Sequence, residues 1–153
     1  MKTLLMLILL CCFGWFQSPT LKIISATEQE WRGGRKESGK GINYMFTMLA
    51  GESSENLKFE KIYIKEMCFN AVVYHQKSDL SQHSDFKKND TLILQINRQW
   101  LPIEGNLSEQ KNYTDEKPKI EMKGEAMIQY TLKGKRYFQV VSKIEKLKAE
   151  QYQ

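Results

Sequence analysis

The feature that most constrains the fold is a strict period of two near the C-terminal end of the chain. From Gly124 to Leu132, apolar or small residues alternate with Glu125, Met127, Gln129 and Thr131. Successive side chains of a strand point to opposite faces, so one face is predicted to point into a core. That face consists of Ala126, Ile128, Tyr130 and Leu132. The following Lys133-Gly134-Lys135 is a turn signal, so this segment and "RYFQVVSKI" are predicted to form a β-hairpin.

Other segments show the same pattern. Strands are predicted around residues 28–32, at 42–50, at 57–64 with a bulge that corrects a change of phase, at 68–74, and at 91–97, where Leu92, Leu94 and Ile96 share a face. Only the tail, residues 142–151, is predicted to form a helical turn or two. The chain is therefore expected to be all-β, a single antiparallel β-sandwich, Ig-like or jelly-roll-like, of about seven or eight strands.

The N-terminal segment predicts export. Lys2 precedes an uncharged apolar run of 13 residues, "LLMLILLCCFGWF". A membrane-spanning helix needs about 20 residues, whereas the apolar part of a secretory signal is shorter. We predict a signal peptide at residues 1–26, cleaved after Ala26, and one β-sandwich domain at residues 27–153. Two alternatives stay open: acylation of Cys11 or Cys12, or a retained leader. In either case the protein would be held at a membrane.

The mature chain keeps one cysteine, Cys68, so no internal disulfide is expected. This favours a periplasmic or cell-envelope location, with the extracellular space as the other option, over a disulfide-rich animal fluid. Cys68 itself is expected to be a small buried apolar residue, and an intermolecular disulfide is the alternative. Removing Lys2 and Lys22 lowers the formal charge of +5 by two, to +3, and the remaining basic residues are mixed with acids. Nucleic acid is therefore not a predicted partner.

The stretch "GRKESGKG" resembles a phosphate-binding loop of the Walker A type. Gly34, Gly39 and Lys40 match that pattern, but Gly41 stands where a hydroxyl residue should hold Mg²⁺. The flanking residues predict strands, not a buried strand followed by a helix. We therefore predict a link between two strands, and no nucleotide site.

A long polar connection between residues 97 and 120 contains a cluster of larger apolar side chains, Trp100, Leu101 and Ile103. Loops of this length are uncommon in compact domains and often have a function. These three residues are either anchors that hold the loop on the sandwich edge or contacts to a ligand or partner. They are the predicted contact residues, because an exposed aromatic is a typical anchor.

The segment "HQKSDLSQH" holds the best candidates for chemistry, His75, Asp79 and His83, four residues apart. On a helix they would share one face, and two imidazoles with a carboxylate suit Zn²⁺. However, the serine-rich context predicts a surface loop, so we predict no cofactor. No residue lies in a recognisable nucleophile motif, and no catalytic residue is assigned.

With its leader, "EWRGGRKESGKGINYMFTM", "FKKNDTLIL" and "KGEAMIQYTLKGKRYFQVVSKIEKL", the chain resembles small exported proteins of unknown function from Bacteroidetes-type bacteria. The resemblance implies an envelope location and a β-sandwich, and no activity. We expect a non-enzymatic exported module that binds a protein, a glycan or a small ligand in the cell envelope. The alternative is a metal-dependent or acid-base hydrolase that uses the region of His75, Asp79 and His83.

Overall fold

The computed structural model describes residues 21–35, 38–75 and 85–152, which are all strand, turn or irregular chain. Within these ranges the chain has no helix that is long and apolar enough to cross a membrane. The described chain is all-β, as the alternation predicted.

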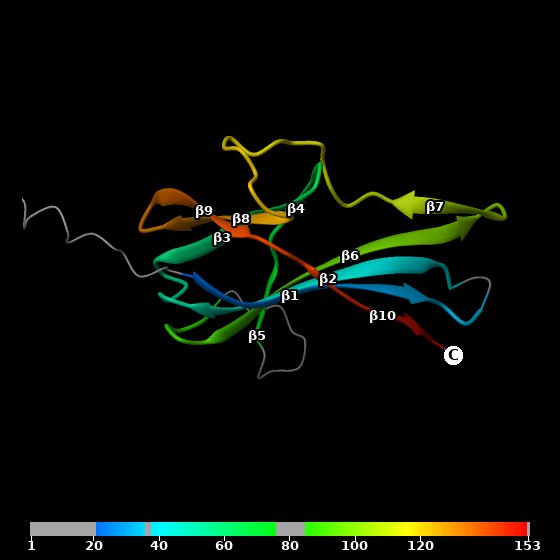
Figure 1. The fold of residues 1–153 in the computed structure, drawn as a ribbon, viewed down its shortest axis with the longest axis horizontal. Helices are drawn as coiled ribbons and strands as arrows, with labels where there is room; N and C mark the ends of the chain where they lie inside the picture. The colour runs from blue at the N-terminus through cyan, green and yellow to red at the C-terminus, as the bar shows by residue number, and fades with distance from the viewer. Residues whose placement is uncertain (1–20, 36–37, 76–84, 153) are drawn as a thin grey trace, which may run out of the picture.

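In the described ranges, ten strands form two sheets (Figure 1). The strands are β1 (Leu21–Arg32), β2 (Lys40–Ala50), β3 (Leu57–Ile64), β4 (Met67–Asn70), β5 (Val73–His75), β6 (Thr91–Ile103), β7 (Asn106–Gln110), β8 (Ala126–Leu132), β9 (Lys135–Val141) and β10 (Glu145–Gln151). The six-stranded sheet has the order β10-β1-β2-β6-β5, with β7 also paired to β6, and the four-stranded sheet has the order β4-β3-β8-β9. All pairs are antiparallel except β1 with β10, which is parallel.

One apolar core joins the two sheets, which gives the fold its sandwich-like character. The inward residues of the six-stranded sheet include Phe46, Met48 and Leu94, and those of the four-stranded sheet include Ile62 and Ile128, all of them fully buried. The face predicted for the 124–132 segment is correct for Ala126, Ile128 and Tyr130, which are buried in this core, with Leu132 at its margin. In Figure 1, β1, β2 and β6 extend beyond the four-stranded sheet toward β7. Part of the inward face of the larger sheet therefore lies outside this core.

Local details of the pattern are also confirmed. The register of β3 against β8 shifts between Phe59 and Lys61, which is the bulge that the change of phase predicted. The turn between β8 and β9 consists of Lys133 and Gly134, both with positive φ, 49° and 80°. This is the backbone geometry that a two-residue hairpin requires, and glycine adopts it at no steric cost.

The helical prediction for residues 142–151 is wrong. Glu145–Gln151 is the strand β10, and all of its side chains are exposed. Lysine, glutamate, leucine and alanine favour a helix, but the edge of β1 offers a row of backbone hydrogen-bond partners. Edge pairing overrides the local preference.

The single strand predicted at residues 68–74 is in fact two strands, one in each sheet. β4 pairs with β3, and β5 pairs with β6 of the larger sheet. Between them, the backbone N–H of Ala71 donates to the carbonyl of Glu60, the bulged residue of β3, at 3.1 Å. The chain leaves the four-stranded sheet at this point and crosses to the other sheet.

The long connection predicted at residues 97–120 is half strand. β6 continues to Ile103 and turns back into β7 through Glu104 and Gly105, both with positive φ. Pro102 makes this stretch look like a loop, but β6 tolerates it opposite Leu107 of β7. These extra strands raise the number above the seven or eight that were predicted.

The domain boundary predicted at Ala26 lies inside β1. Leu21 and Ala26 are both buried in the core, and residues 21–26 pair with β2. Residues 1–20 lie outside the described ranges. A chain that began at Thr27 would therefore lack the first half of β1.

Candidate ligand-binding surface

The outward face of the six-stranded sheet carries no charged side chain over the middle of its three longest strands. Strand pairing places residues 25–31 of β1, 41–47 of β2 and 93–101 of β6 side by side, and every second residue points outward. The outward residues are Ser25, Thr27, Gln29, Trp31, Gly41, Asn43, Met45, Thr47, Ile93, Gln95, Asn97, Gln99 and Leu101. Charged residues make up 27% of the chain, yet none lies among these. We call this set the neutral face.

Side-chain amides cross the neutral face in register. Gln29 lies opposite Asn43, and Asn43 lies opposite Asn97. Gln29 donates to the carbonyl of Lys148 on β10 at 3.1 Å, while Oδ1 of Asn43 is buried without a partner among the described residues. The side chains of Gln95 and Asn97 form no hydrogen bond within the described part of the chain. The sheet therefore presents amide donors and acceptors that the described part of the chain does not use.

A groove of about 550 Å³ opens at one edge of the neutral face. Its floor is the stretch of β6 between the last pair with β5, at Leu94, and the first pair with β7, at Gln99. Its lining residues are Phe69, Asn70, Val72, Tyr74, Gln95, Ile96, Asn97 and Asn112. Four of these have amide side chains and none is charged. The groove is thus a concave site that, like the neutral face, is lined by amide side chains and carries no charge.

Two connections between the sheets form the walls of this groove. The first is the crossing from β4 to β5, which is visible in Figure 1. The second follows β7, where Nδ2 of Asn112 donates to the carbonyl of Asn97 at 2.9 Å and Thr114 pairs with Cys68 of the smaller sheet. Since both walls are attached to strands, the groove is formed before any ligand binds.

Trp31 lies against the backbone of β2 on the neutral face. A Cβ atom on Gly41 would come within 2.4 Å of Nε1 of Trp31, so only glycine allows the ring to lie so close to the strand. Tyr152 meets this ring edge-on, with ring centroids 6.1 Å apart. Nε1 of Trp31 is buried without a partner among the residues that the structure describes. The result is a half-buried aromatic ring held against the sheet.

The three predicted contact residues lie on opposite faces of one strand. Trp100, Leu101 and Ile103 lie on β6, so Trp100 points to the inward face while Leu101 and Ile103 point outward. Ile103 is 50% exposed, and Leu101 is half-buried beside Gly39. The structure therefore separates Trp100 from the other two residues.

Trp100 belongs to a cluster around Arg98 at the uncovered end of the inward face. The Arg98 guanidinium lies 4.9 Å from the Trp100 ring centroid and 5.4 Å from that of Tyr113. Its Nε and Nη2 both donate to Oε1 of Glu109, at 3.0 and 2.5 Å. Burial, with a smaller effect of Glu28, raises the pKa of Tyr44 beside it. The positive charge of Arg98 is thus already neutralised by the carboxylate of Glu109.

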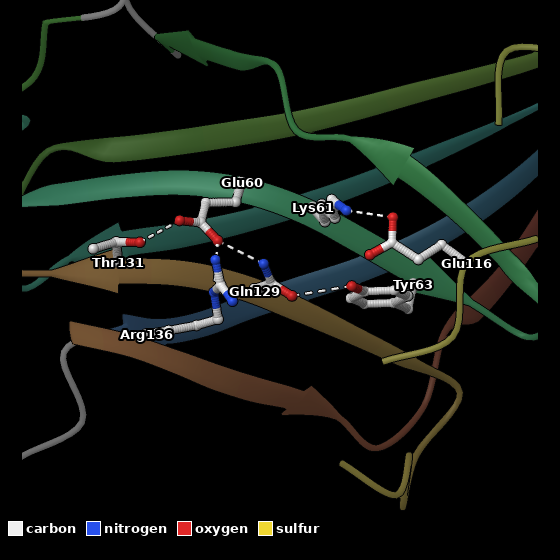
Figure 2. Close-up of polar contacts among 7 residues, drawn as sticks. All are labelled: Glu60, Lys61, Tyr63, Glu116, Gln129, Thr131 and Arg136. Atoms are coloured by element: carbon white, nitrogen blue, oxygen red, sulfur yellow. Dashed lines mark hydrogen bonds and ion pairs between the residues drawn. The ribbon is translucent and has the colours of Figure 1, made fainter. Parts of the chain in front are cut away.

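The outward face of the four-stranded sheet is different, because its polar groups are paired (Figure 2). Glu60 accepts hydrogen bonds from the Thr131 hydroxyl, from Nε2 of Gln129 at 2.5 Å and from Nε of Arg136 at 3.1 Å. Gln129 in turn accepts from the Tyr63 hydroxyl at 3.0 Å. The hydrogen bond from Thr131 and then that from Gln129 lower the pKa of Glu60. A carboxylate held ionised in this way is unsuited to act as a general acid.

Residues 111–124 cover part of that same face. Thr114 pairs with Cys68, Glu116 forms an ion pair with Lys61, and Met122 packs on a small cluster of buried Tyr63, Cys68 and Met127. Cys68 is therefore the buried apolar residue that the sequence predicted. Its burial disfavours an intermolecular disulfide.

The predicted metal residues lie mostly outside the described ranges. Asp79 and His83 are among residues 76–84, and of His75 only the backbone, at the end of β5, is described. In the described ranges no group of three histidine, cysteine or acidic side chains could hold a metal ion.

No known family matches. Neither a protein-family model, nor a curated protein, nor a solved structure shows significant similarity to this chain.

Sequence reasoning missed the neutral face, although its signal was present. In residues 25–31, 41–47 and 93–101, the odd-numbered positions are free of charge in all three strands. Recognising that they form one surface requires the strand order β1-β2-β6, which local patterns do not supply. The groove depends in addition on the crossing from β4 to β5, which was predicted as a continuous strand.

Proposed function

We propose that this protein is an exported, non-enzymatic β-sandwich module that binds a neutral, hydroxyl-rich ligand, a glycan, on its neutral face and in the adjoining groove. The observation that carries this proposal is the set of unused amides on a charge-free sheet face. The groove at the edge of the face supplies the concave part of the site.

The chemistry of these side chains suits sugars. Each sugar hydroxyl can donate and accept a hydrogen bond, and a carboxamide offers both functions. Binding a neutral ligand here requires no desolvation of a charged group, which would be costly. Aromatic rings such as those of Trp31 and Tyr74 can pack against the apolar C–H faces of a sugar ring. Amides for the hydroxyls and rings for the C–H faces together favour a glycan over a charged or a purely apolar ligand.

The location and the type of sandwich are also part of the proposal. The leader and the resemblance to exported Bacteroidetes-type proteins support the periplasm or cell envelope, and the shared core supports one sandwich of Ig-like or jelly-roll-like type. Because residues 21–26 pair with β2 and Leu21 is buried in the core, we propose cleavage before Leu21. N-terminal sequencing of protein from the envelope fraction tests this point. A mature chain that starts at Thr27, or an intact leader, would contradict it.

The binding proposal can be tested with a panel of neutral oligosaccharides and insoluble polysaccharides. The variant Gln95→Ala combined with Asn97→Ala removes two of the four groove amides. A hydrogen bond contributes about 0.5–1.5 kcal/mol, so we expect affinity to fall about tenfold. Isothermal titration calorimetry on a sugar that the wild type binds measures this fall.

The matched control is Gln139→Ala, an amide on β9 of the other sheet, which should leave binding unchanged. Equal binding by the double variant and the wild type would contradict the site. If no sugar of the panel binds and sedimentation experiments show self-association through this face, the ligand would be a protein and not a glycan.

A further inference from the structure

A second cavity, of about 490 Å³, lies at the end of the six-stranded sheet, where the connection between β1 and β2 meets the hairpin of β6 and β7. Its lining residues are Arg32, Gly33, Arg35, Gly39, Lys40, Pro102, Gly105 and Leu107. Three of these are cationic, and no acid is found among the described lining residues. We call this site the basic end pocket.

The arrangement of the cations in the basic end pocket lowers the stability of the fold, because two of them repel each other. Arg32 and Lys40 lie directly opposite each other on β1 and β2, with their side chains on the same face. Like charges placed directly opposite in an antiparallel pair are destabilising. Basic residues elsewhere, such as Arg98, Arg136 and Lys146, each have a carboxylate partner.

Within the described chain Arg32, Arg35 and Lys40 have no carboxylate partner. Lys40 contacts only an aromatic ring, with Nζ 5.9 Å from the ring centroid of Trp100. Glu37 belongs to the same connection but lies outside the described residues.

The backbone holds these groups in place. Gly39 has a φ of +71°, and a Cβ atom there would lie 2.2 Å from the carbonyl oxygen of Trp100, so this part of the connection is pressed against β6. The N–H of Gly33 donates to the carbonyl of Gly39 at 3.0 Å, which ties the two ends of the connection together. The backbone that carries Arg32 and Lys40, at the two ends of the connection, is therefore fixed in the absence of a ligand.

We propose that the basic end pocket binds an oxyanion, the phosphate or sulfate group of a ligand. An anion among Arg32, Arg35 and Lys40 would remove their mutual repulsion and form charge-assisted hydrogen bonds, which are the strong ones. Residues that break a local rule of stability are expected at functional sites. Pro102 and Leu107, which is 51% exposed, provide an apolar wall for the body of the ligand.

This site is distinct from both the Walker A pattern and the neutral face. The connection joins two antiparallel strands, and its described residues include no helix N-terminus that could hold a nucleotide. Arg32 and Lys40 point to the sheet face opposite the neutral face, and the ligand chemistry is charged, not neutral. The inference therefore stands independently of glycan binding.

Phosphate titration of the full chain tests this proposal, with chemical shifts of the Arg35 and Gly39 amides and the melting temperature as measurements. Inorganic phosphate and sulfate are the free-ion probes, and vesicles of phosphatidylcholine with phosphatidylglycerol test a lipid phosphate as the source. We expect a saturable shift at these amides, a raised melting temperature, and at least tenfold weaker phosphate binding in the triple variant Arg32→Gln, Arg35→Gln, Lys40→Gln.

Two further variants complete the test. The control variant Lys133→Gln with Lys135→Gln removes two exposed charges at the β8–β9 turn of the other sheet. Because this turn is distant from the basic end pocket, phosphate binding should stay unchanged. Arg32→Gln alone should weaken phosphate binding without lowering the melting temperature in phosphate-free buffer, since it relieves repulsion.

Binding to vesicles but not to free phosphate, lost in the triple variant, would support the proposal with a lipid as the source. Equal phosphate binding by the triple variant and the wild type, or no binding to any probe, would overturn it.

Discussion

The two outward sheet faces of this molecule use their polar side chains in opposite ways. On the four-stranded sheet, Glu60 and Gln129 are satisfied by neighbouring side chains, and residues 111–124 cover part of the surface. On the six-stranded sheet, Gln95 and Asn97 have no side-chain partner among the described residues. A face whose polar groups bind one another contributes to stability, whereas a face whose polar groups stay free is available to a ligand.

The largest expected difference between the faces concerns their apolar residues. Met127 points outward on β8 yet is fully buried with Tyr63 and Cys68. Met127→Ala should lower the free energy of unfolding by about 2–5 kcal/mol, since it leaves a cavity. Denaturant unfolding measures this loss. A loss as small as that of Met45→Ala, an exposed methionine on the neutral face, would show that the four-stranded face is not closed.

The next effect concerns the polar network of Figure 2. Glu60→Ala leaves Gln129, Thr131 and Arg136 without their shared acceptor, and Gln129 is buried. An unsatisfied buried polar group costs about 1–3 kcal/mol, and we expect a destabilisation of this size. A melting temperature within experimental error of the wild type would mean that the network is not formed in solution.

The pH dependence of stability sharpens the same comparison. The pKa of Glu60 is lower in the folded chain than its ordinary value of 4.5, chiefly because Thr131 and Gln129 donate to the carboxylate. Its stabilising contribution is therefore present above the unfolded pKa and is lost as the pH falls through the folded pKa.

The stability difference between the wild type and Glu60→Gln should accordingly shrink as the pH falls below 4.5, the ordinary pKa of this side chain. Thermal melts above and below this pH check the prediction. Gln95→Ala serves as the control, because it removes no titratable group and should run parallel to the wild type. A Glu60→Gln profile that is also parallel to the wild type would contradict the lowered pKa.

The smallest expected effect lies on the neutral face itself. Asn97 is exposed and its side chain is unbonded among the described residues, so Asn97→Ala should change stability by no more than about 0.5 kcal/mol. Chemical denaturation provides the measurement. A loss above 1 kcal/mol would indicate that this face has a structural role, which would weaken the binding proposal.

Much of the architecture follows from local sequence. Three features depend only on neighbouring residues, and all three were predicted correctly. They are the alternation in β8, the Lys133-Gly134 turn and the bulge before Lys61. The edge strand β10 was not, because Lys, Glu and Leu prefer a helix until a sheet edge is available. The break between β4 and β5 was missed for a similar reason, since it is fixed by a hydrogen bond to Glu60.

The candidate site is less predictable than the fold, because it is assembled from separate strands. Trp100 was noticed as a conspicuous aromatic, but its ring contacts Arg98 and Lys40 on the inward face. Asn43, Asn97 and Asn112 are inconspicuous in sequence and meet only through register and a crossing connection. Charge-free positions at period two were the available signal.

The most direct test of the account observes the side-chain amides of both faces in one experiment. Asparagine and glutamine NH₂ groups give separate NMR signals, so Gln129 is an internal reference for Gln95 and Asn97. We predict that titration with a neutral oligosaccharide shifts the signals of Gln95 and Asn97 and leaves that of Gln129 unchanged. Shifts confined to Gln129 and its neighbours, or none on the neutral face with any sugar tested, would contradict the central claim that this face is the one left open for a ligand.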